Sequence, residues 1–308
     1  MSAAPTERLS RNGASRDIDV SFEFFPPKTA DADKVLWECI ARLLPLSPRF
    51  VSVTYGAGGT TRERTHQTVT RLVRESSVPP AAHLTCVAAS KDDVNEVAQS
   101  YWDAGVRHIV ALRGDPPAGI GTHYEPHPQG YAYADNLVAG LKNIADFEVS
   151  VACYPETHPE SRSLEADIDI LKAKVDAGAD RAITQFFFDN DTYERYVERV
   201  RRAGIELPIV PGIVPVHSFN AIAGFAKKAG ASVPNWLAQR FEGLENDPAT
   251  RQLVAAAVAA EQVLDLVDRG VDQFHFYTMN RADLAVAICH MIGIRAAYQE
   301  PVRAATAA

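Results

Sequence analysis

The chain has 308 residues and a formal net charge of −8, from 31 Lys and Arg against 39 Asp and Glu, and 46% of its residues are hydrophobic. The negative balance argues against binding to a nucleic-acid backbone, because such proteins usually carry a basic field. The polar, Arg-containing start lacks the apolar core of a secretory signal, and no apolar run reaches the ~18 residues of a membrane span. The length suits one α/β barrel with insertions.

The predicted elements alternate along the chain. Short apolar runs with the character of strands are separated by stretches whose apolar residues recur at helical spacing. In chain order, the predicted strands are Val20–Phe24, Phe50–Tyr55, Ala82–Cys86, His108–Leu112, Val149–Tyr154, Arg181–Phe186, Ile209–Gly212 and Phe274–Tyr277. The predicted helices between and after them are Lys34–Leu44, Arg64–Glu75, Lys91–Ala104, Tyr133–Ile144, Leu164–Ala177, Asp191–Ala203, Ser218–Lys228 and Ala282–Ile292.

Eight strand–helix repeats predict a parallel α/β sheet covered by helices on both faces. Eight units in this length favour a closed (β/α)₈ TIM barrel over an open doubly wound sheet, and no GxGxxG motif follows the first strand. Two extra helices, about 234–242 and 248–269, are expected before the eighth strand. We expect one catalytic barrel over residues 18–300, between a flexible segment (1–17) and a disordered tail (301–308).

The four cysteines are widely spaced, lie in apolar segments and form no CxxC pair: Cys39, Cys86, Cys153 and Cys289. This pattern predicts reduced, buried thiols in a cytoplasmic protein. His123 and His127 have a spacing that can bind zinc on a helix, but Pro126 and Pro128 argue against a helix there. We therefore expect no metal.

In α/β barrels the active site lies at the carboxyl ends of the strands. The first strand ends in FEFFPP, where Glu23 stands among aromatic residues. Desolvation there should raise the pKa of Glu23 and suit it to act as a general acid near neutral pH. A buried Glu paired with a core Arg is the alternative.

The other strand ends add polar and aromatic side chains. The glycines of 56–59 either allow a ligand to approach the backbone or form a plain loop. His83 is either a site residue or a hydrogen-bonded core residue. Arg113 and Asp115 flank a glycine, where they either hold an anion and a heterocycle or pair with each other. With Gln185 and several Tyr and Phe, this rim suits a planar heteroaromatic ligand, and hence redox or pterin chemistry.

Eight phrases, in this order, resemble the methylenetetrahydrofolate reductase family, in its bacterial, catalytic-domain-only form. They are VSFEFFPPKT, FVSVTYGAGG with RTH after it, AAHLTCV, RHIVALRGDPP, SVACYPETHPE, KVDAGADRAITQFFFD, IVPGIVPV and FHFYTMNRA, and they run from Val20 to about Met291. The resemblance implies a (β/α)₈ barrel and a homo-oligomer active in one-carbon metabolism and methionine biosynthesis. It also implies ping-pong hydride transfer from NADH or NADPH through FAD to 5,10-methylenetetrahydrofolate.

The same resemblance implies roles for individual residues. Glu23 would be the acid that opens the folate ring, and Asp115 would lie near both the flavin and the pterin. Gln185 would contact folate and nicotinamide in turn, and Phe225 would stack on either, although its helical apolar surroundings also fit core packing. Tyr277 and Arg281 would lie along the folate. The residues implied to hold FAD are Thr54 (also placed with the substrates), Tyr55, His83, Arg113, Gly114, Asp115, Ala134, Tyr154, His158, Asp167 and Lys174.

The chain departs from the family pattern in four places. Ile170 and Ala173 stand where polar FAD contacts are expected, Ala221 replaces a polar folate contact, and the loop 119–131 looks long. Lys174 should therefore contribute more to binding the FAD phosphates.

Other functions stay open at this stage. The same fold could transfer folate methyl groups to a corrinoid or another acceptor without a flavin, could reduce folate without a flavin, or could bind folate or flavin without catalysis. No Arg cluster is placed for a 2′-phosphate, which favours NADH over NADPH.

Overall fold

The computed structural model describes residues 18–56, 61–116, 119 and 122–296. The predicted flexible start (1–17) and tail (301–308) lie outside the described residues, as does most of the glycine loop (57–60). The single-barrel prediction therefore concerns the part between them.

Parallel strands form one sheet in the order β7-β6-β5-β4-β3-β2-β1-β9-β8. The strands are β1 (Asp19–Phe24), β2 (Phe50–Val53), β3 (Pro80–Thr85), β4 (His108–Leu112), β5 (Glu148–Cys153), β6 (Arg181–Thr184), β7 (Ile209–Val210), β8 (Gly212–Ile213) and β9 (Gln273–Tyr277). All eight predicted strands are present, and the seventh is divided into β7 and β8.

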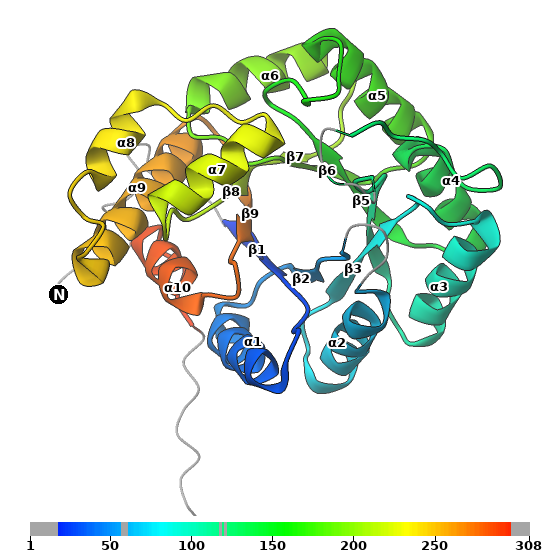
Figure 1. Cartoon of the computed structure of the whole chain (residues 1–308), viewed down its shortest axis with the longest axis horizontal. Coiled ribbons are helices and arrows are strands. Elements are labelled where there is room, and N and C mark those ends of the chain that lie inside the picture. Colours follow the sequence, from blue (N-terminus) through cyan, green and yellow to red (C-terminus); the bar gives the residue numbers. More distant parts are fainter. Residues whose placement is uncertain (1–17, 57–60, 117–118, 120–121, 297–308) are drawn as a thin grey trace, which may run out of the picture.

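The division of the seventh strand explains how the sheet closes. The two ends of the strand order, β7 and β8, are separated in sequence by Pro211 alone. Proline has no N–H to donate, so it interrupts a strand ladder. Its carbonyl still accepts from the His275 N–H at 3.0 Å. β7 pairs with β6 and β8 pairs with β9, so the interrupted strand closes the ring seen in Figure 1.

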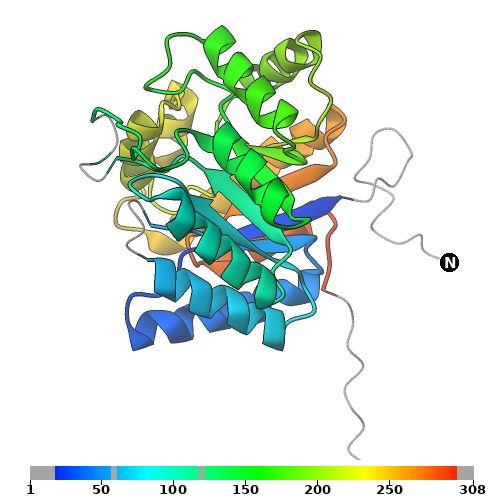
Figure 2. The same ribbon diagram turned by 90° about the vertical axis from the view of Figure 1, so that its right-hand side faces the viewer.

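Helices surround the ring of strands (Figures 1 and 2). They are α1 (Ala30–Leu43), the short 3₁₀ turn η2 (Leu44–Leu46), α2 (Arg62–Glu75), α3 (Lys91–Asp103), α4 (Ala134–Ile144), α5 (Leu164–Asp176), α6 (Asn190–Arg202), α7 (Phe219–Ala229), α8 (Asn235–Phe241), α9 (Pro248–Asp268) and α10 (Ala282–Met291). The two extra helices predicted before the last strand are α8 and α9. The prediction of a (β/α)₈ barrel is confirmed.

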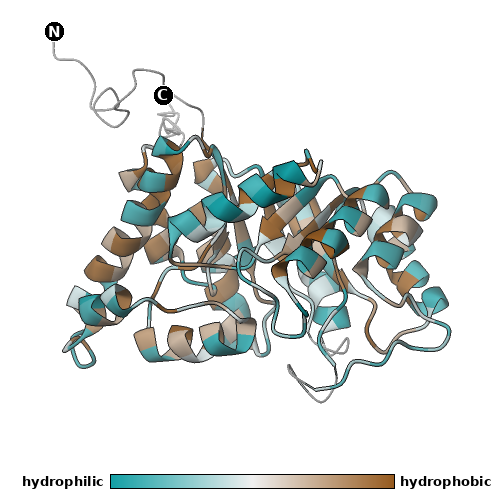
Figure 3. Cartoon of the chain, turned by 90° about the horizontal axis from the view of Figure 1, so that it is seen from above, coloured by the Kyte–Doolittle hydropathy of each residue, from teal (hydrophilic) through white to brown (hydrophobic). Residues whose placement is uncertain are grey.

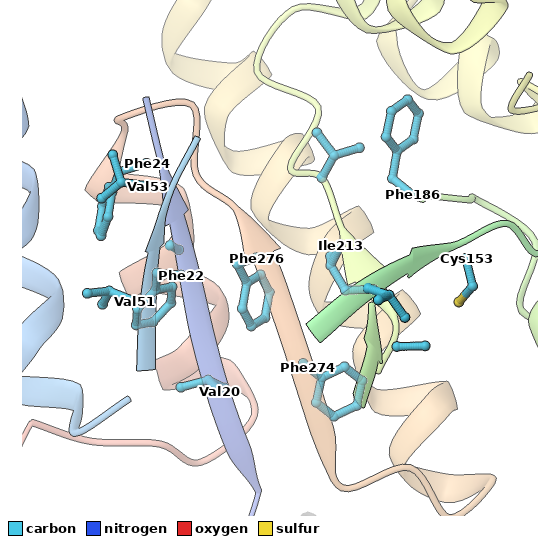
Figure 4. Close-up of a cluster of buried hydrophobic side chains, with 14 of the residues drawn as sticks. Val20, Phe22, Phe24, Val51, Val53, Cys153, Phe186, Ile213, Phe274 and Phe276 are labelled. Carbon is cyan, nitrogen blue, oxygen red and sulfur yellow. The ribbon is translucent and has the colours of Figure 1, made fainter. Parts of the chain in front are cut away.

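Most of the core lies between the strands and the helices. On β1, Val20, Phe22 and Phe24 are buried in this layer, and Figure 4 shows them beside Phe274 and Phe276 of β9. The helices cover this layer with their apolar faces and leave their hydrophilic faces outside (Figure 3). The four cysteines are buried and free, as predicted.

The inside of the barrel holds a second, smaller set of side chains. Its apolar part contains Phe50, Ala81, Val110, Ile183 and Val210. Because successive side chains of a strand point to opposite faces, residues one position away from the outer core point inward. Several of these inward residues are polar and still buried: Ser21, His83, His108, Ser150, Arg181 and His275. This polar interior leads upward to the candidate site.

Among the described residues, no helix combines the length and apolar character needed to cross a membrane. Within the same residues, no group of three or more His, Cys, Asp or Glu side chains is arranged to hold a metal ion.

Gly212 should be required for barrel closure. A Cβ at this position would lie 2.3 Å from the Thr184 carbonyl oxygen and 2.5 Å from the Tyr277 ring. We expect Gly212→Ala to destabilise the fold by ~1–3 kcal/mol, the usual cost of overpacking, and to lower the melting temperature by several degrees.

The control for this prediction is Gly224→Ala on α7, where an added Cβ meets nothing within 4 Å. Alanine also favours a helix over glycine, so this variant should melt at or above the wild-type temperature. Equal melting temperatures for the two variants would show that close packing at Gly212 does not matter.

Candidate active site

Many of the predicted site residues lie on or just after the carboxyl ends of the strands, and others lie on helices α4, α5 and α7. A cavity of about 890 Å³ opens at the opposite end of the barrel, between α6 and the turn from α9 to β9. Its lining contains none of the predicted site residues. In barrels of this type the chemistry is found at the carboxyl-terminal face, so we build the site there.

Glu23, near the end of β1, lies between two histidine rings. Its Oε2 is 3.3 Å from Nε2 of His83 on β3 and 3.6 Å from Nε2 of His275 on β9. The Glu23 side chain is 13% exposed, and the His275 side chain is 1% exposed. Neither Nε2 has another hydrogen-bond partner. The three residues form one buried group, which we call the Glu23 cluster.

The contacts within the Glu23 cluster give the Glu23 carboxyl group a pKa that differs from the predicted one. Burial raises the pKa of Glu23, but the contacts with His275 and His83 outweigh it, and the pKa falls from its ordinary value of 4.5 to about 2. The prediction of a raised pKa is therefore wrong for the free protein. The alternative of a core Arg partner is also wrong, because the partners are histidines.

A hydrogen-bonded turn after β9 holds the end of β1. The Thr278 hydroxyl donates to the Glu23 carbonyl at 2.6 Å. The Asn280 side chain accepts from the Phe25 N–H at 2.9 Å and donates to the Phe25 carbonyl at 3.0 Å. Met279 and Asn280 both have positive φ, at 53° and 56°, a left-handed conformation that is costly for Met and tolerated by Asn. These bonds fix the backbone that carries Glu23.

A second polar group lies on the ends of β4 and β5. Arg113 pairs with Glu160 at 2.6 Å and lies over the Tyr124 ring. Asp115 lies within electrostatic reach of Arg113, Glu160 and His158, and burial raises its pKa. Arg113 therefore forms its ion pair with Glu160 and not with Asp115, the local partner that the sequence suggested.

His158 and Lys174 complete this second group. The Asp167 carboxylate, at the start of α5, accepts a hydrogen bond from the backbone N–H of His158 at 2.8 Å. The Lys174 ammonium donates to the Ala152 carbonyl at 2.8 Å, and burial lowers its pKa. Lys174 is half-buried, and its ammonium group reaches the end of β5. Arg113, Asp115, His158, Asp167 and Lys174 are named the β4–β5 group below.

Tyr277 lies at the end of β9, within electrostatic reach of Glu23 and Tyr154. Its hydroxyl donates to the Thr184 carbonyl at 2.6 Å, across the ring from β9 to β6. Burial raises the pKa of Tyr277, and the charge of Glu23 adds to the effect. Gln185 follows Thr184 directly, and its side-chain oxygen accepts from the next backbone N–H, that of Phe186, at 3.0 Å. Phe225 is 40% exposed and stacks on Phe186 at 5.4 Å.

Other predicted residues are spread around the rim. Thr54 is half-buried, and its carbonyl accepts from the Thr65 hydroxyl. Burial raises the pKa of both Tyr55 and Tyr154. Arg281 is exposed at the start of α10. The further rim residues are Gly114, with φ of +85°, and the buried Ala134, the first residue of α4.

Ile170 and Ala173 are both exposed on α5, one turn or less from Lys174.

Sequence reasoning missed His275, Ser21 and Glu160. The first two carried a usable signal, because polar residues at alternate positions of two apolar strands must share a face. In the β1–β9 pairing, Ser21 lies opposite His275 and Glu23 lies opposite Tyr277. Glu160 carried no such signal, since it lies in an irregular loop.

The side chains of the β4–β5 group fit a dinucleotide such as FAD. Two side-chain cations, Arg113 and Lys174, and the titratable His158 stand within electrostatic reach of one another at the mouth. Cationic donors of this kind bind phosphates. The mouth therefore offers cationic side chains near the ends of β4 and β5, and a carboxylate–histidine cluster on β1, β3 and β9.

Fold and site together define a (β/α)₈ barrel with a buried carboxylate–histidine cluster and a second group of charged side chains at its carboxyl-terminal end. The family model for "Methylenetetrahydrofolate reductase" matches residues 8–293. The 5,10-methylenetetrahydrofolate reductases of Pectobacterium carotovorum and Escherichia coli are each 50% identical to this chain over 278 residues. These alignments cover 90% of this chain and 91% and 92% of the relatives.

The chain belongs to the methylenetetrahydrofolate reductase family, a family of oxidoreductases that reduce methylenetetrahydrofolate. An Arabidopsis thaliana relative, "Methylenetetrahydrofolate reductase (NADH) 1", is 33% identical, and the alignment covers 48% of that longer protein. A solved Clostridium thermocellum protein, described as binding two copies of 5-methyl-5,6,7,8-tetrahydrofolic acid, has a TM-score of 0.62 over 90% of this chain and 94% of its own. At 13% identity it shows the shared fold.

The lowered pKa of Glu23 gives a prediction for stability against pH. A carboxyl group whose pKa is lower in the folded state stabilises the fold above its ordinary pKa, and that stability is lost as the pH falls. For Glu23 the loss runs from about 4.5 towards about 2. We expect Glu23→Gln to lower the unfolding free energy at pH 7 by up to ~3 kcal/mol, with a gap that narrows below pH ~4.5.

Urea unfolding between pH 3.5 and 7 measures this gap. The control is Glu38→Gln, which alters an exposed carboxyl group on α1 and should show no such pH dependence. A gap for Glu23→Gln that stays constant or widens in acid would contradict the interpretation that the histidine contacts stabilise the ionised carboxylate.

Proposed function

We propose that this protein reduces 5,10-methylenetetrahydrofolate to 5-methyltetrahydrofolate, with NADH as the hydride donor and FAD as the bound cofactor. The observation that carries the proposal is the Glu23 cluster beside the β4–β5 group, in a chain of this family. The reaction needs a proton donor and a site for a charged dinucleotide, and the two groups supply one each. We also propose a cytoplasmic homo-oligomer.

FAD would be held by the β4–β5 group and its neighbours. Arg113, His158 and Lys174 would face the phosphates, while Thr54, Tyr55, His83, Gly114, Asp115, Ala134, Tyr154 and Asp167 complete the proposed FAD site. When bound, FAD supplies hydride chemistry, accepting a hydride from the nicotinamide and later donating one to the folate.

The substrates would bind in turn on the side of Gln185, Phe225, Tyr277 and Arg281. Phe225 is exposed enough to stack on a planar ring, and its contact with Phe186 supports it from behind. Gln185 would hydrogen-bond the nicotinamide or the pterin. NADH is favoured because no Arg cluster in the sequence is placed for a 2′-phosphate.

Glu23 would open the folate ring. It would donate a proton to the bridging nitrogen outside the pterin, so that the bond from this nitrogen to the one-carbon unit breaks. The carbon then carries cationic iminium character, which the Asp115 carboxylate would stabilise. Hydride transfer to this carbon leaves a methyl group, and proton and hydride together account for both added hydrogens. Since Glu23 is ionised in the free protein, its cluster must first take up that proton.

Glu23→Gln should separate the two half-reactions. Reduction of the flavin by NADH needs no protein acid, so its rate should stay near the wild-type value. Reoxidation by methylenetetrahydrofolate should slow by ~10² to 10⁴ or more, the usual loss for a general acid. Stopped-flow flavin absorbance measures both. Equal slowing of the two halves would make Glu23 structural, and normal reoxidation would place the acid elsewhere.

Lys174→Ala should weaken FAD binding by ~10- to 100-fold, since it removes a charged hydrogen-bond donor. Titration of the apoprotein with FAD measures the dissociation constant, and the melting temperature shows how much of the effect is folding. Lys172→Ala is the matched control, because this neighbour on α5 is exposed and pairs with Asp176. The FAD placement is wrong if the two variants bind FAD equally well.

A further inference from the structure

Ser21 lies directly behind His275 in the barrel interior. Its Oγ is 2.7 Å from the His275 Nδ1 and 3.2 Å from the Phe274 carbonyl oxygen. Ser21 is 3% exposed and His275 is 1% exposed, so water does not compete for these contacts. The hydroxyl has one proton and two acceptors within reach, and it can donate to only one at a time.

The opposite nitrogen of the same ring faces Glu23. The His275 Nε2 lies 3.6 Å from the Glu23 Oε2 and has no other partner. A neutral imidazole has one N–H and one lone pair, so the role of one nitrogen determines the role of the other. Whether Nδ1 accepts a hydrogen bond from Ser21 or donates one to it therefore affects the protonation of the Nε2 that faces Glu23.

Two arrangements satisfy these contacts, and they differ by one proton. In the unloaded arrangement, the Ser21 hydroxyl donates to Nδ1, and the Nε2–H faces an ionised Glu23. In the loaded arrangement, Nδ1–H donates to the Ser21 oxygen and the hydroxyl turns to the Phe274 carbonyl. The additional proton then lies between Nε2 and the Glu23 carboxyl.

We propose that Ser21 and His275 are positioning residues for the acid, and that rotation of the Ser21 hydroxyl towards Phe274 accompanies loading of the proton that Glu23 gives to the folate. This inference rests on the proposed role of Glu23. The proton comes from solvent, passes to the folate nitrogen when its bond to carbon breaks, and leaves the cluster unloaded.

The number of hydrogen bonds that Ser21 can make favours the loaded arrangement. The hydroxyl makes one hydrogen bond in the unloaded arrangement and two in the loaded one. Burial lowers the pKa of His275, with further lowering by His83 and Arg181, while Glu23 opposes this. His108 and Tyr277 are the other titratable groups in electrostatic contact with the pair. Loading is therefore unfavourable in the free protein, and the bond added by Ser21 assists it.

The barrel contains a matched control for this arrangement. Ser150 of β5 bonds to the His108 Nε2 of β4 at 2.8 Å, and both residues are buried. This is the same type of buried Ser–His contact, but neither residue touches Glu23. Ser150→Ala should therefore cost a similar amount of stability without changing the proton on Glu23.

The test is the rate of flavin reoxidation by methylenetetrahydrofolate as a function of pH, in stopped-flow, for the FAD-loaded protein. In Ser21→Ala, the fall of the reoxidation rate at alkaline pH should begin about 0.5 to 1 pH unit lower than in wild type. A shift of this size corresponds to the loss of one hydrogen bond. In Ser150→Ala the fall should stay at the wild-type position. Reduction by NADH should be unchanged in both. A fall at the wild-type pH in Ser21→Ala, or equal shifts in both variants, would overturn the proposal.

A second measurement does not depend on turnover. Nitrogen-15 chemical shifts of labelled histidine report which ring nitrogen carries the proton, and His275→Gln identifies the His275 signals. In wild type, acidification should increase the fraction of His275 rings that carry a proton on Nδ1. In Ser21→Ala this change should need a lower pH, and Ser21→Thr, which keeps the hydroxyl, should restore it. The same titration midpoint in wild type and Ser21→Ala would also overturn the proposal.

The outcome can be distinguished from failure of the proposed function. Normal folate turnover by Glu23→Gln would reject Glu23 as the acid, whatever Ser21 does. An inactive Glu23→Gln together with an unshifted Ser21→Ala would leave the function standing and reject only the role of Ser21 and His275.

Discussion

The site depends most on one interaction, the contact of a buried carboxylate with two histidine rings. A carboxylate taken out of water is costly unless charged or hydrogen-bonding partners compensate. His83 and His275 provide this compensation for Glu23 from two other strands. The result is an anion at the mouth of the barrel interior, in contact with two imidazole rings. An acid that must act repeatedly needs such a neighbourhood, because its proton has to be replaced after each turnover.

The strand register makes this contact possible. β1 pairs with β9 so that Ser21 faces His275 and Glu23 faces Tyr277. A slip of one residue would exchange the two faces of a strand, and would put Phe22 inside the barrel and Glu23 among the helices. The aromatic outer layer, in which Phe22 lies 6.0 Å from Phe276, therefore sets the position of the polar interior. The same packing that stabilises the fold aligns the reactive groups.

The sequence predicted the fold well because its signals are local. Alternating apolar runs and helical spacing are properties of neighbouring residues, and they placed all eight strands and the two extra helices. The environment of Glu23 was predicted wrongly, since its aromatic sequence neighbours point to the outer layer while its spatial partners come from β3 and β9. The contacts of Lys174 and Arg113 were not predicted, for the same reason. Their partners, the Ala152 carbonyl and Glu160, are set by tertiary structure and not by spacing along the chain.

The two polar groups of the mouth divide the proposed reaction between them. In the proposal, the β4–β5 group would present cations to a dinucleotide and the Glu23 cluster would supply the proton, while the Tyr277 hydroxyl donates across the ring from β9 to β6. The central claim is that electrons pass through a bound flavin to the folate at this mouth. An anaerobic absorbance titration of the purified protein tests it most directly. We expect a flavin spectrum that NADH bleaches and methylenetetrahydrofolate restores, with one 5-methyltetrahydrofolate formed per flavin. A protein that binds no flavin, or a bleached flavin that the folate does not reoxidise, would contradict the account.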